Sequence, residues 1–278
     1  MTTKVKLSPP VKKTVQVMAR WSYVVKGILF CGVAVFAVRM ALGLSRKEPN
    51  QRQVLETLFS QPLGQLMLLV VALALSAHTL WRVVETIEDP YQKGTSPGGL
   101  LHRFTYLLSG ITYGSLAVTT FKLVFGNQAG GENTNQLWVA QLLHREGGEW
   151  LVVVAGAVML TWALVQLKKA LTQGLYKSLE IDDLPAFWRG LIHLVGAVGF
   201  ITQSSMLAGM GYYLLRAAWL KNPRYVKSID DLLELVGHMP HGTTWLLLLA
   251  GGIFLFGLFM FVMARYFPLK LTQHSHTA

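Results

Sequence analysis

Charged residues are scarce in this chain of 278 residues, where Asp, Glu, Lys and Arg together account for 14%. A typical soluble domain carries about 25%. Cysteine is nearly absent: Cys31 stands alone, which excludes an intrachain disulfide and a metal site built from cysteine only. Hydrophobic residues make up 52% and the mean hydropathy is +0.41. This composition excludes a disordered chain, collagen and a coiled coil, and it argues against a soluble globular enzyme.

The few charges are mostly positive. There are 25 Lys and Arg against 14 Asp and Glu, a net charge of +11. On a soluble protein this excess would suggest nucleic acid. On an apolar chain it indicates cationic loops against anionic lipid headgroups. We therefore expect the lipid bilayer as a partner and no nucleic acid.

Six stretches are long and apolar enough to cross a membrane, which takes about 20 residues in a helix. They cover residues 18–44, 63–84, 104–125, 150–171, 188–217 and 245–267. The first follows a basic segment, as in a signal sequence. It is longer than a signal-peptide core of about 7–15 residues and contains Lys26 and Arg39, so we interpret it as a retained span.

Counting Lys and Arg at the loops and helix ends predicts the orientation. With both termini cytoplasmic, 14 lie inside and 9 outside, and Lys26 and Arg39 fall within the first span. The bias favours cytoplasmic termini.

Two sequence elements recur in the same order, which indicates an internal repeat. An arginine followed by a glycine seven positions later opens the first, third and fifth stretches: Arg20 and Gly27, Arg103 and Gly110, Arg189 and Gly196. A short amphipathic segment ending in glycine precedes each of the others, over residues 54–64, 138–148 and 232–242. These segments predict short helices at the outer lipid interface.

The repeat predicts an all-α integral membrane protein of three parallel two-helix units with pseudo-threefold symmetry about the membrane normal. The units cover residues 18–89, 101–172 and 187–267 of one membrane domain over 18–267. A basic tail, 1–17, precedes it, and a second tail, 268–278, follows. Small residues favour close helix packing. We therefore expect the first, third and fifth helices inside, and the Leu-rich runs 66–75 and 246–261 facing lipid.

The Arg-aromatic-x-Tyr-x-x-x-Gly opening, the Pro-x-Gly before the second helix, and His78-Thr-Leu-Trp-Arg82 near its end carry a family resemblance. With these motifs, residues 18–267 resemble the bacterial domain-of-unknown-function 1206 family. The resemblance implies tandem two-helix membrane units, commonly three per chain, in a bacterial inner or thylakoid-type membrane. It implies no activity. The third unit departs most, because Gly190 rather than an aromatic residue follows Arg189.

Several charged residues at one end of the predicted bundle are candidates for a site. Arg20, Arg103 and Arg189 would either anchor to lipid headgroups or form a ring of cations that binds an anion or gates a pore. Acidic clusters around Glu85 and Asp183 would pair with these arginines or hold a divalent ion. Lys26 lies inside a span, where a charge is costly unless paired, and Glu85 is its expected structural partner.

The polar residues deeper in the spans have two readings each. His78 and His193 would either bond to neighbouring helices or ligate a haem iron between them. Gln203, Ser204 and Ser205 would either form interhelical hydrogen bonds or line a substrate path at a broken helix. No motif indicates a cofactor, a metal or a catalytic centre.

These features favour a non-enzymatic scaffold or accessory subunit that binds another membrane protein. The alternative is a channel or transporter for a small solute or an ion, with its path at the repeat interface. A polar axis would favour transport, and an axis closed by Leu, Val and Phe would favour the scaffold.

Overall fold

The computed structural model describes residues 9–44, 51–88, 94–125, 134–172, 179, 181 and 183–266. The predicted C-terminal tail and the start of the N-terminal tail lie outside these residues. The described chain is helical. Its long helices are α1 (Pro9–Ala41), α3 (Gly64–Glu88), α4 (Pro97–Val124), α6 (Gly148–Leu171), α7 (Ala186–Trp219) and α9 (Gly242–Tyr266). The short ones are α2 (Gln51–Phe59), α5 (Thr134–Leu143), η2 (Pro223–Tyr225) and α8 (Ile229–Gly237).

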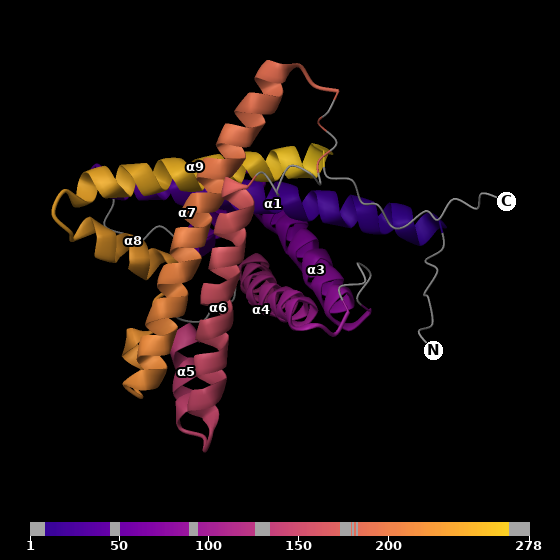
Figure 1. Ribbon diagram of the computed structural model, residues 1–278. Coiled ribbons are helices and arrows are strands. Elements are labelled where there is room, and N and C mark those ends of the chain that lie inside the picture. Colours follow the sequence, from indigo (N-terminus) through magenta and orange to yellow (C-terminus); the bar gives the residue numbers. More distant parts are fainter. Residues whose placement is uncertain are drawn as a thin grey trace.

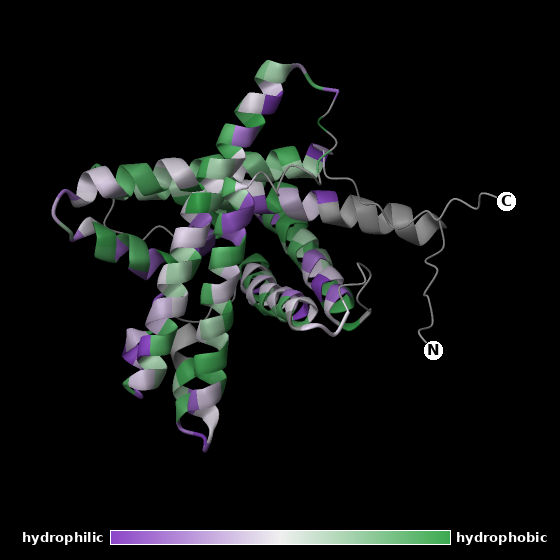
Figure 2. Ribbon diagram, viewed as in Figure 1, coloured by the Kyte–Doolittle hydropathy of each residue, from purple (hydrophilic) through white to green (hydrophobic). Residues whose placement is uncertain are grey.

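The six long helices carry the six predicted spans, so the all-α membrane fold is confirmed. Each contains an apolar segment long enough to cross a bilayer. Figure 2 shows hydrophobic residues along much of these helices, with hydrophilic residues gathered toward their ends. The span of the first helix begins at Arg20, although α1 itself begins at Pro9, within the segment predicted as a tail.

The long helices pack in three close pairs, α1 with α9, α3 with α4, and α6 with α7 (Figure 1). In each pair the second helix of one unit lies against the first helix of the next, and the third unit closes onto the first. The two helices within a unit pack less closely, least of all α4 and α6. The same type of contact thus recurs three times around a closed ring, as expected for three tandem units. The units are interleaved, however, and are not separate hairpins.

The expectation that the first, third and fifth long helices, α1, α4 and α7, lie together inside the bundle is wrong. The main neighbours of α1, α4 and α7 are α9, α3 and α6, so these three helices do not form a central cluster. The buried share of each span depends on how closely the helix packs against its neighbours in the ring. Half of the α1 span and 44% of the α9 span are buried, against 22% for α4 and 17% for α6. Leu68 on α3 is fully buried although it lies in a run expected to face lipid, because one face of every helix in a ring turns inward.

The glycines nevertheless form contact faces, as predicted. A Cβ on Gly27 would lie 2.8 Å from the Phe261 ring, and one on Gly257 would lie 2.6 Å from Cys31 Sγ, both across the α1–α9 contact. Across α3–α4, a Cβ on Gly114 would lie 3.1 Å from Thr79 Cγ2. Thr79 and Gly257 both lie 15 positions after the glycine that begins their helix. Small residues let these helices approach closely.

The same turn precedes the second long helix of all three units. The backbone N–H of Gly64, Gly148 and Gly242 donates to the carbonyl three residues earlier, at 2.8, 2.9 and 2.8 Å. The residue before each glycine has a positive φ: Leu63 at 62°, Gly147 at 73° and His241 at 60°. Gly147 has ψ near −3°, the geometry of a type II turn. A Cβ on the glycine would collide with a carbonyl oxygen at the end of the short helix in each unit.

Two of the short helices, α2 and α8, pack against the bundle and do not simply lie on the lipid interface. Their buried residues are Val54 and Leu55 on α2, and Leu232 and Leu233 on α8. A Cβ on Gly32 of α1 would lie 2.6 Å from Val54, and one on Gly209 of α7 would lie 3.0 Å from Leu232. Val54 and Leu232 each lie ten positions before the glycine that begins the next long helix. The two contacts are therefore equivalent.

This equivalence changes the alignment of the third unit. Aligning Arg189 with Arg20 would place Gly32 opposite residue 201, whereas the contact places it opposite Gly209. The first helix of the third unit is thus longer at its start, and α7 has 34 residues. The position that corresponds to Gly27 and Gly110 is Ser204, not Gly196.

Candidate polar site between α1, α3 and α4

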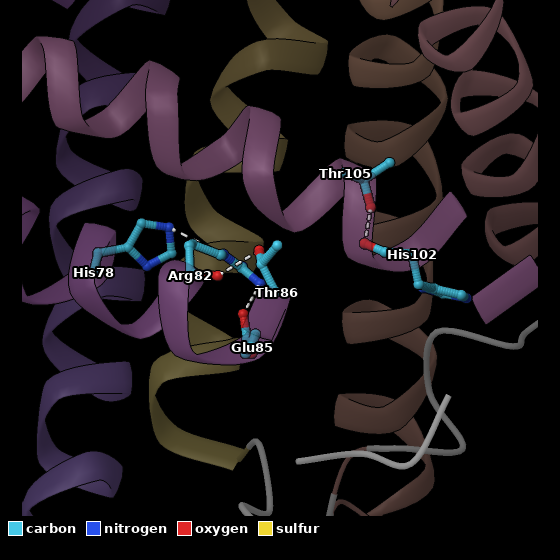
Figure 3. A network of polar contacts seen from close by, with 6 residues as sticks. All are labelled: His78, Arg82, Glu85, Thr86, His102 and Thr105. Atoms are coloured by element: carbon cyan, nitrogen blue, oxygen red, sulfur yellow. Dashed lines mark hydrogen bonds and ion pairs between the residues drawn. The ribbon is translucent and has the colours of Figure 1, made fainter. Parts of the chain in front are cut away.

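A group of charged and polar side chains is buried between α1, α3 and α4. On α3, Arg82 Nη1 donates to Glu85 Oε2 at 2.6 Å (Figure 3). Their side chains are only 16% and 4% exposed. Because a buried charge is costly unless paired, this ion pair satisfies the carboxylate that the sequence places within a span.

His78 extends the group one turn along α3. Arg82 Nε donates to His78 Nε2 at 3.4 Å. Because Nε2 accepts this bond, the imidazole there is neutral. The His78 ring also packs against the Tyr113 ring of α4 in a T-shaped contact, with ring centroids 4.9 Å apart. His78 is therefore a packed interior residue with two side-chain partners.

Lys26 reaches the same group from α1. Its Nζ lies 4.3 Å from the centroid of the Tyr113 ring, and the residue is only 9% exposed. A cation over an aromatic face is attracted by the ring quadrupole. The ion pair expected between Lys26 and Glu85 is replaced by two separate contacts, since Glu85 pairs with Arg82.

Helical spacing explains why these residues meet. His78, Arg82 and Glu85 are at positions i, i+4 and i+7, which fall on one face of α3. On α4, Tyr106 and Tyr113 are seven apart and flank Gly110, where a Cβ would lie 3.3 Å from Arg82 Cβ. The Arg82 guanidinium lies 5.2 Å from the Tyr106 centroid. The glycine lets α4 approach, and the tyrosines then cover the cations.

The three arginines at the helix starts have different surroundings. Arg103 Nε donates to Thr86 O at 2.8 Å, and Nη2 donates to Ile87 O at 3.2 Å. Arg103 therefore caps carbonyls in the last turn of α3, which also favours a cation. Arg20 and Arg189 are exposed on α1 and α7. The structure thus places Arg103 in a local contact and leaves the other two available to solvent or headgroups.

The remaining sequence candidates do not gather into one site. His78 lies on α3 and His193 on α7, two helices that do not pack closely, so the histidines are not brought together as a ligand pair. The helix expected to break near Gln203 is continuous from Ala186 to Trp219. Ser205 Oγ donates to Ile201 O of its own helix at 3.0 Å. Ser204 Oγ is buried without a hydrogen-bond partner in the described part of the chain.

Much of the acidic cluster around Asp183 lies outside the described residues, as does Asp89 next to Glu88. Asp183 itself is exposed. Glu85 is the member of these clusters that the structure pairs, with Arg82. On the opposite edge of α4, His102 meets Trp162 of α6 in a T-shaped contact at 5.0 Å, and Thr105 Oγ1 donates to the His102 carbonyl (Figure 3).

The tandem units agree with a known family. The family model described as Domain of Unknown Function (DUF1206) matches residues 21–89, 104–173 and 198–266. The chain belongs to this family. The third match begins at 198, in agreement with the register derived from the Gly32 and Gly209 contacts. The recognition made from the sequence motifs is confirmed.

A relative of the DUF1206 chain comes from Bacillus subtilis (strain 168) and carries the description "Uncharacterized protein YxxB". It is 27% identical over 261 residues, which are 94% of each chain. No solved structure matches the chain. The protein is a multi-pass membrane protein with bacterial relatives.

The repeat register shows that the buried polar group belongs to the first unit. The positions that correspond to His78 on α3 are Trp162 on α6 and Phe256 on α9. Those that correspond to Arg82 are Gln166 and Met260. The i, i+4, i+7 spacing of His78, Arg82 and Glu85 is the sequence signal that could have identified this group. The sequence placed Arg82 in the family motif, and Arg82 was not included among the candidate site residues.

Proposed function

We propose that this DUF1206 protein is a non-enzymatic scaffold or accessory subunit of a bacterial inner membrane, with cytoplasmic termini, that binds another membrane protein. The observation that carries the proposal is the apolar interior. Phe30 of α1, Phe200 of α7 and Phe256 of α9 meet edge to face, with centroids 4.8 and 5.2 Å apart. Phe259 is fully buried beside them, 5.6 Å from Phe200. An interior filled by aromatic rings leaves little room for a water-filled path.

The seam between α4 and α6 supports a role in binding. These helices are neighbours in the ring, yet they pack less closely than any other neighbouring pair and have the least buried spans. Large apolar side chains are exposed on both, among them Ile111 and Val118 on α4 and Val154 and Leu164 on α6. Helices in lipid associate through close packing rather than the hydrophobic effect. A partner helix would complete the packing that α4 and α6 lack between them.

Transport of a small solute or ion is the second candidate, because intramembrane ionisable residues often mark a pathway. Lys26, Arg82 and Glu85 are such residues. They lie toward one end of the α1 span and of α3, and the aromatic interior does not continue their polar character along α7 and α9. We therefore rank binding above transport.

Photocrosslinking in cells tests the proposal. A photoreactive residue placed at Val118 or Leu164 samples an exposed face of α4 or α6, and one placed at the similarly exposed Leu73 of α3 serves as the control. The proposal expects a discrete crosslinked protein from the α4 and α6 positions and none from the control. Crosslinks to lipid alone at all three positions would contradict it. Solute or ion flux in proteoliposomes containing the purified protein would favour transport instead.

A further inference from the structure

With Lys26 protonated, the buried polar group carries more positive than negative charge. Lys26 and Arg82 then contribute two cations, and Glu85 contributes one carboxylate, which is bonded to Arg82. His78 accepts a bond from Arg82 and is neutral. Among the described side chains of this buried group, the protonated Lys26 is left as the excess cation. A charge held inside a membrane span is costly, so an anion near Lys26 would be strongly favoured.

The contacts of Lys26 are incomplete. An ammonium group has three N–H donors. Within the described residues the ammonium lies 4.3 Å from the centroid of the Tyr113 ring and has no hydrogen-bond acceptor. The aromatic face covers one side of the ammonium and accepts no conventional hydrogen bond. The donors therefore remain available to an acceptor supplied from outside the protein.

The depth of Lys26 suits a ligand at the membrane surface. It lies six residues into the span that starts at Arg20, which is about 9 Å along a helix axis. The lysine stem can direct its head toward the interface. Glu85 and Arg103 lie at the same end of the bundle, since α3 ends where α4 begins. The Arg82 guanidinium supplies a second positive charge nearby, and its Nε and Nη1 donate within the group.

We propose that the Lys26 ammonium binds a phosphate group at the end of the bundle where α1, α3 and α4 meet. The phosphate belongs either to an anionic phospholipid headgroup or to a soluble phosphate. The site does not depend on the scaffold role proposed above. It differs from simple headgroup anchoring by exposed arginines, because the cation is buried, covered by Tyr113 and left without a carboxylate of its own.

Calorimetric titration of the full-length protein in an uncharged detergent, after lipid removal, tests the site. The probes are dihexanoyl phosphatidylglycerol, dihexanoyl phosphatidylcholine and inorganic phosphate. We expect saturable binding of phosphatidylglycerol, of inorganic phosphate or of both. Lys26→Met should weaken this binding about ten- to a hundredfold, the effect of losing a charge-assisted hydrogen bond. Lys26→Arg should keep it.

A matched control removes another lysine, on the side of the membrane where Lys26 is predicted to lie. Lys168 is exposed in the last turn of α6, and Lys168→Met should leave binding unchanged. Binding of phosphatidylglycerol alone that depends on Lys26 assigns the lipid as the source, and Lys26-dependent binding of inorganic phosphate assigns a soluble anion. Both support the site. If neither probe binds, if Lys26→Met binds as the wild type does, or if Lys168→Met loses binding equally, the proposal is wrong.

Lys26→Gln provides a second variant that keeps a polar side chain, in case Lys26→Met does not fold. Size-exclusion chromatography and circular dichroism establish folding before each titration. The zwitterionic phosphatidylcholine separates recognition of negative charge from uptake of any lipid. Equal binding of the two lipids by the wild type and by Lys26→Met would also overturn the proposal.

Discussion

Single residues in the turns before α3, α6 and α9 set the backbone conformation between the short helix and the second long helix of each unit. A non-glycine residue with positive φ carries a conformational cost of about 1–2 kcal/mol. Leu63 and His241 carry that cost, whereas the second unit has Gly147 at the same position. The chain therefore contains its own comparison between a strained and a relaxed version of one turn.

Leu63→Gly should stabilise the protein. The side chain is 75% exposed, so little packing is lost, and glycine relieves the positive φ. Allowing for the greater freedom of glycine in the unfolded chain, we expect a gain of up to about 1 kcal/mol. The measurement is unfolding in mixed micelles followed by tryptophan fluorescence. Gly147→Ala is the reverse control: nothing lies within 4 Å of its added Cβ, so a loss there reports the φ strain, reduced by the lower freedom of alanine in the unfolded chain, without a steric clash. A stabilised Gly147→Ala would contradict this account of the turn.

The buried ion pair of α3 should be more sensitive than its counterpart at the surface. Glu85→Leu leaves Arg82 buried without its carboxylate, and we expect a loss of about 3 kcal/mol. Glu56 on α2 pairs with Arg52 at 2.8 Å with both side chains partly exposed. Glu56→Leu should cost less than about 1 kcal/mol. Unfolding midpoints of the two variants, measured side by side, give the comparison.

The double variant Glu85→Leu with Arg82→Met separates a lost interaction from a stranded charge. If the cost arises because Arg82 is left unpaired, removing Arg82 as well should restore most of the stability. Additive losses in the double variant would show instead that the two side chains contribute independently.

At the scale of elements, the six spans and the three short helices could be predicted because each rests on a local pattern. Length and hydropathy define a span, and the glycine before each second helix defines a turn. The pairing of helices could not be predicted in this way. Small faces at Gly27 and Gly114 indicated close contact, but a glycine does not specify its partner. The faces pack against α9 and α3, where they were expected to pack on one another.

The buried group illustrates the same limit. Lys26 and Glu85 were recognised as intramembrane charges at similar depth, which favoured a pair between them. Arg82 is nearer to Glu85 because three residues on one helix face bring side chains together without any tertiary contact. Tyr113 could not be assigned to Lys26 from the sequence, since that contact depends on how closely Gly110 and Gly114 let α4 approach α3.

Helix contacts through glycine should respond sharply to an added methyl group. A Cβ on Gly199 of α7 would lie 2.6 Å from Phe256 Cα and 2.7 Å from its backbone nitrogen on α9. Backbone atoms cannot rotate away as a side chain can, so Gly199→Ala should cost about 1–3 kcal/mol by overpacking. Gly251→Ala is the control, on an exposed position of α9 with nothing within 4 Å. It should change stability by less than about 1 kcal/mol, in the stabilising direction. Equal losses in both variants, measured by unfolding in mixed micelles, would place the effect in the glycines' own helices instead of the contact.

At the scale of the whole molecule, the two ends of the bundle differ. Six consecutive spans alternate in direction. Each short helix, α2, α5 or α8, connects the two long helices of its unit. The three short helices therefore share one side of the membrane. The three repeated turns lie there as well. Arg103, Glu85 and the start of the Lys26 span lie on the other side. The buried charges lie at a single end because they belong to the start of the α1 span and the last turns of α3.

The orientation of this asymmetric bundle follows from its basic residues. The excess of Lys and Arg on one side, 14 against 9, predicts that the side with Lys26 and Glu85 faces the cytoplasm. Reporters fused after Ala278, or inserted at Lys93 or Lys177, should show cytoplasmic activity, and one inserted at Asn127 should show external activity. Alkaline phosphatase and green fluorescent protein fusions at the same sites give opposite signals, so each position serves as its own control. External activity at Lys93 and Lys177 with cytoplasmic activity at Asn127 would show that the protein has the opposite orientation in the membrane. The short helices would then face the cytoplasm, and any phosphate at Lys26 would have to come from the outer leaflet or the external solution.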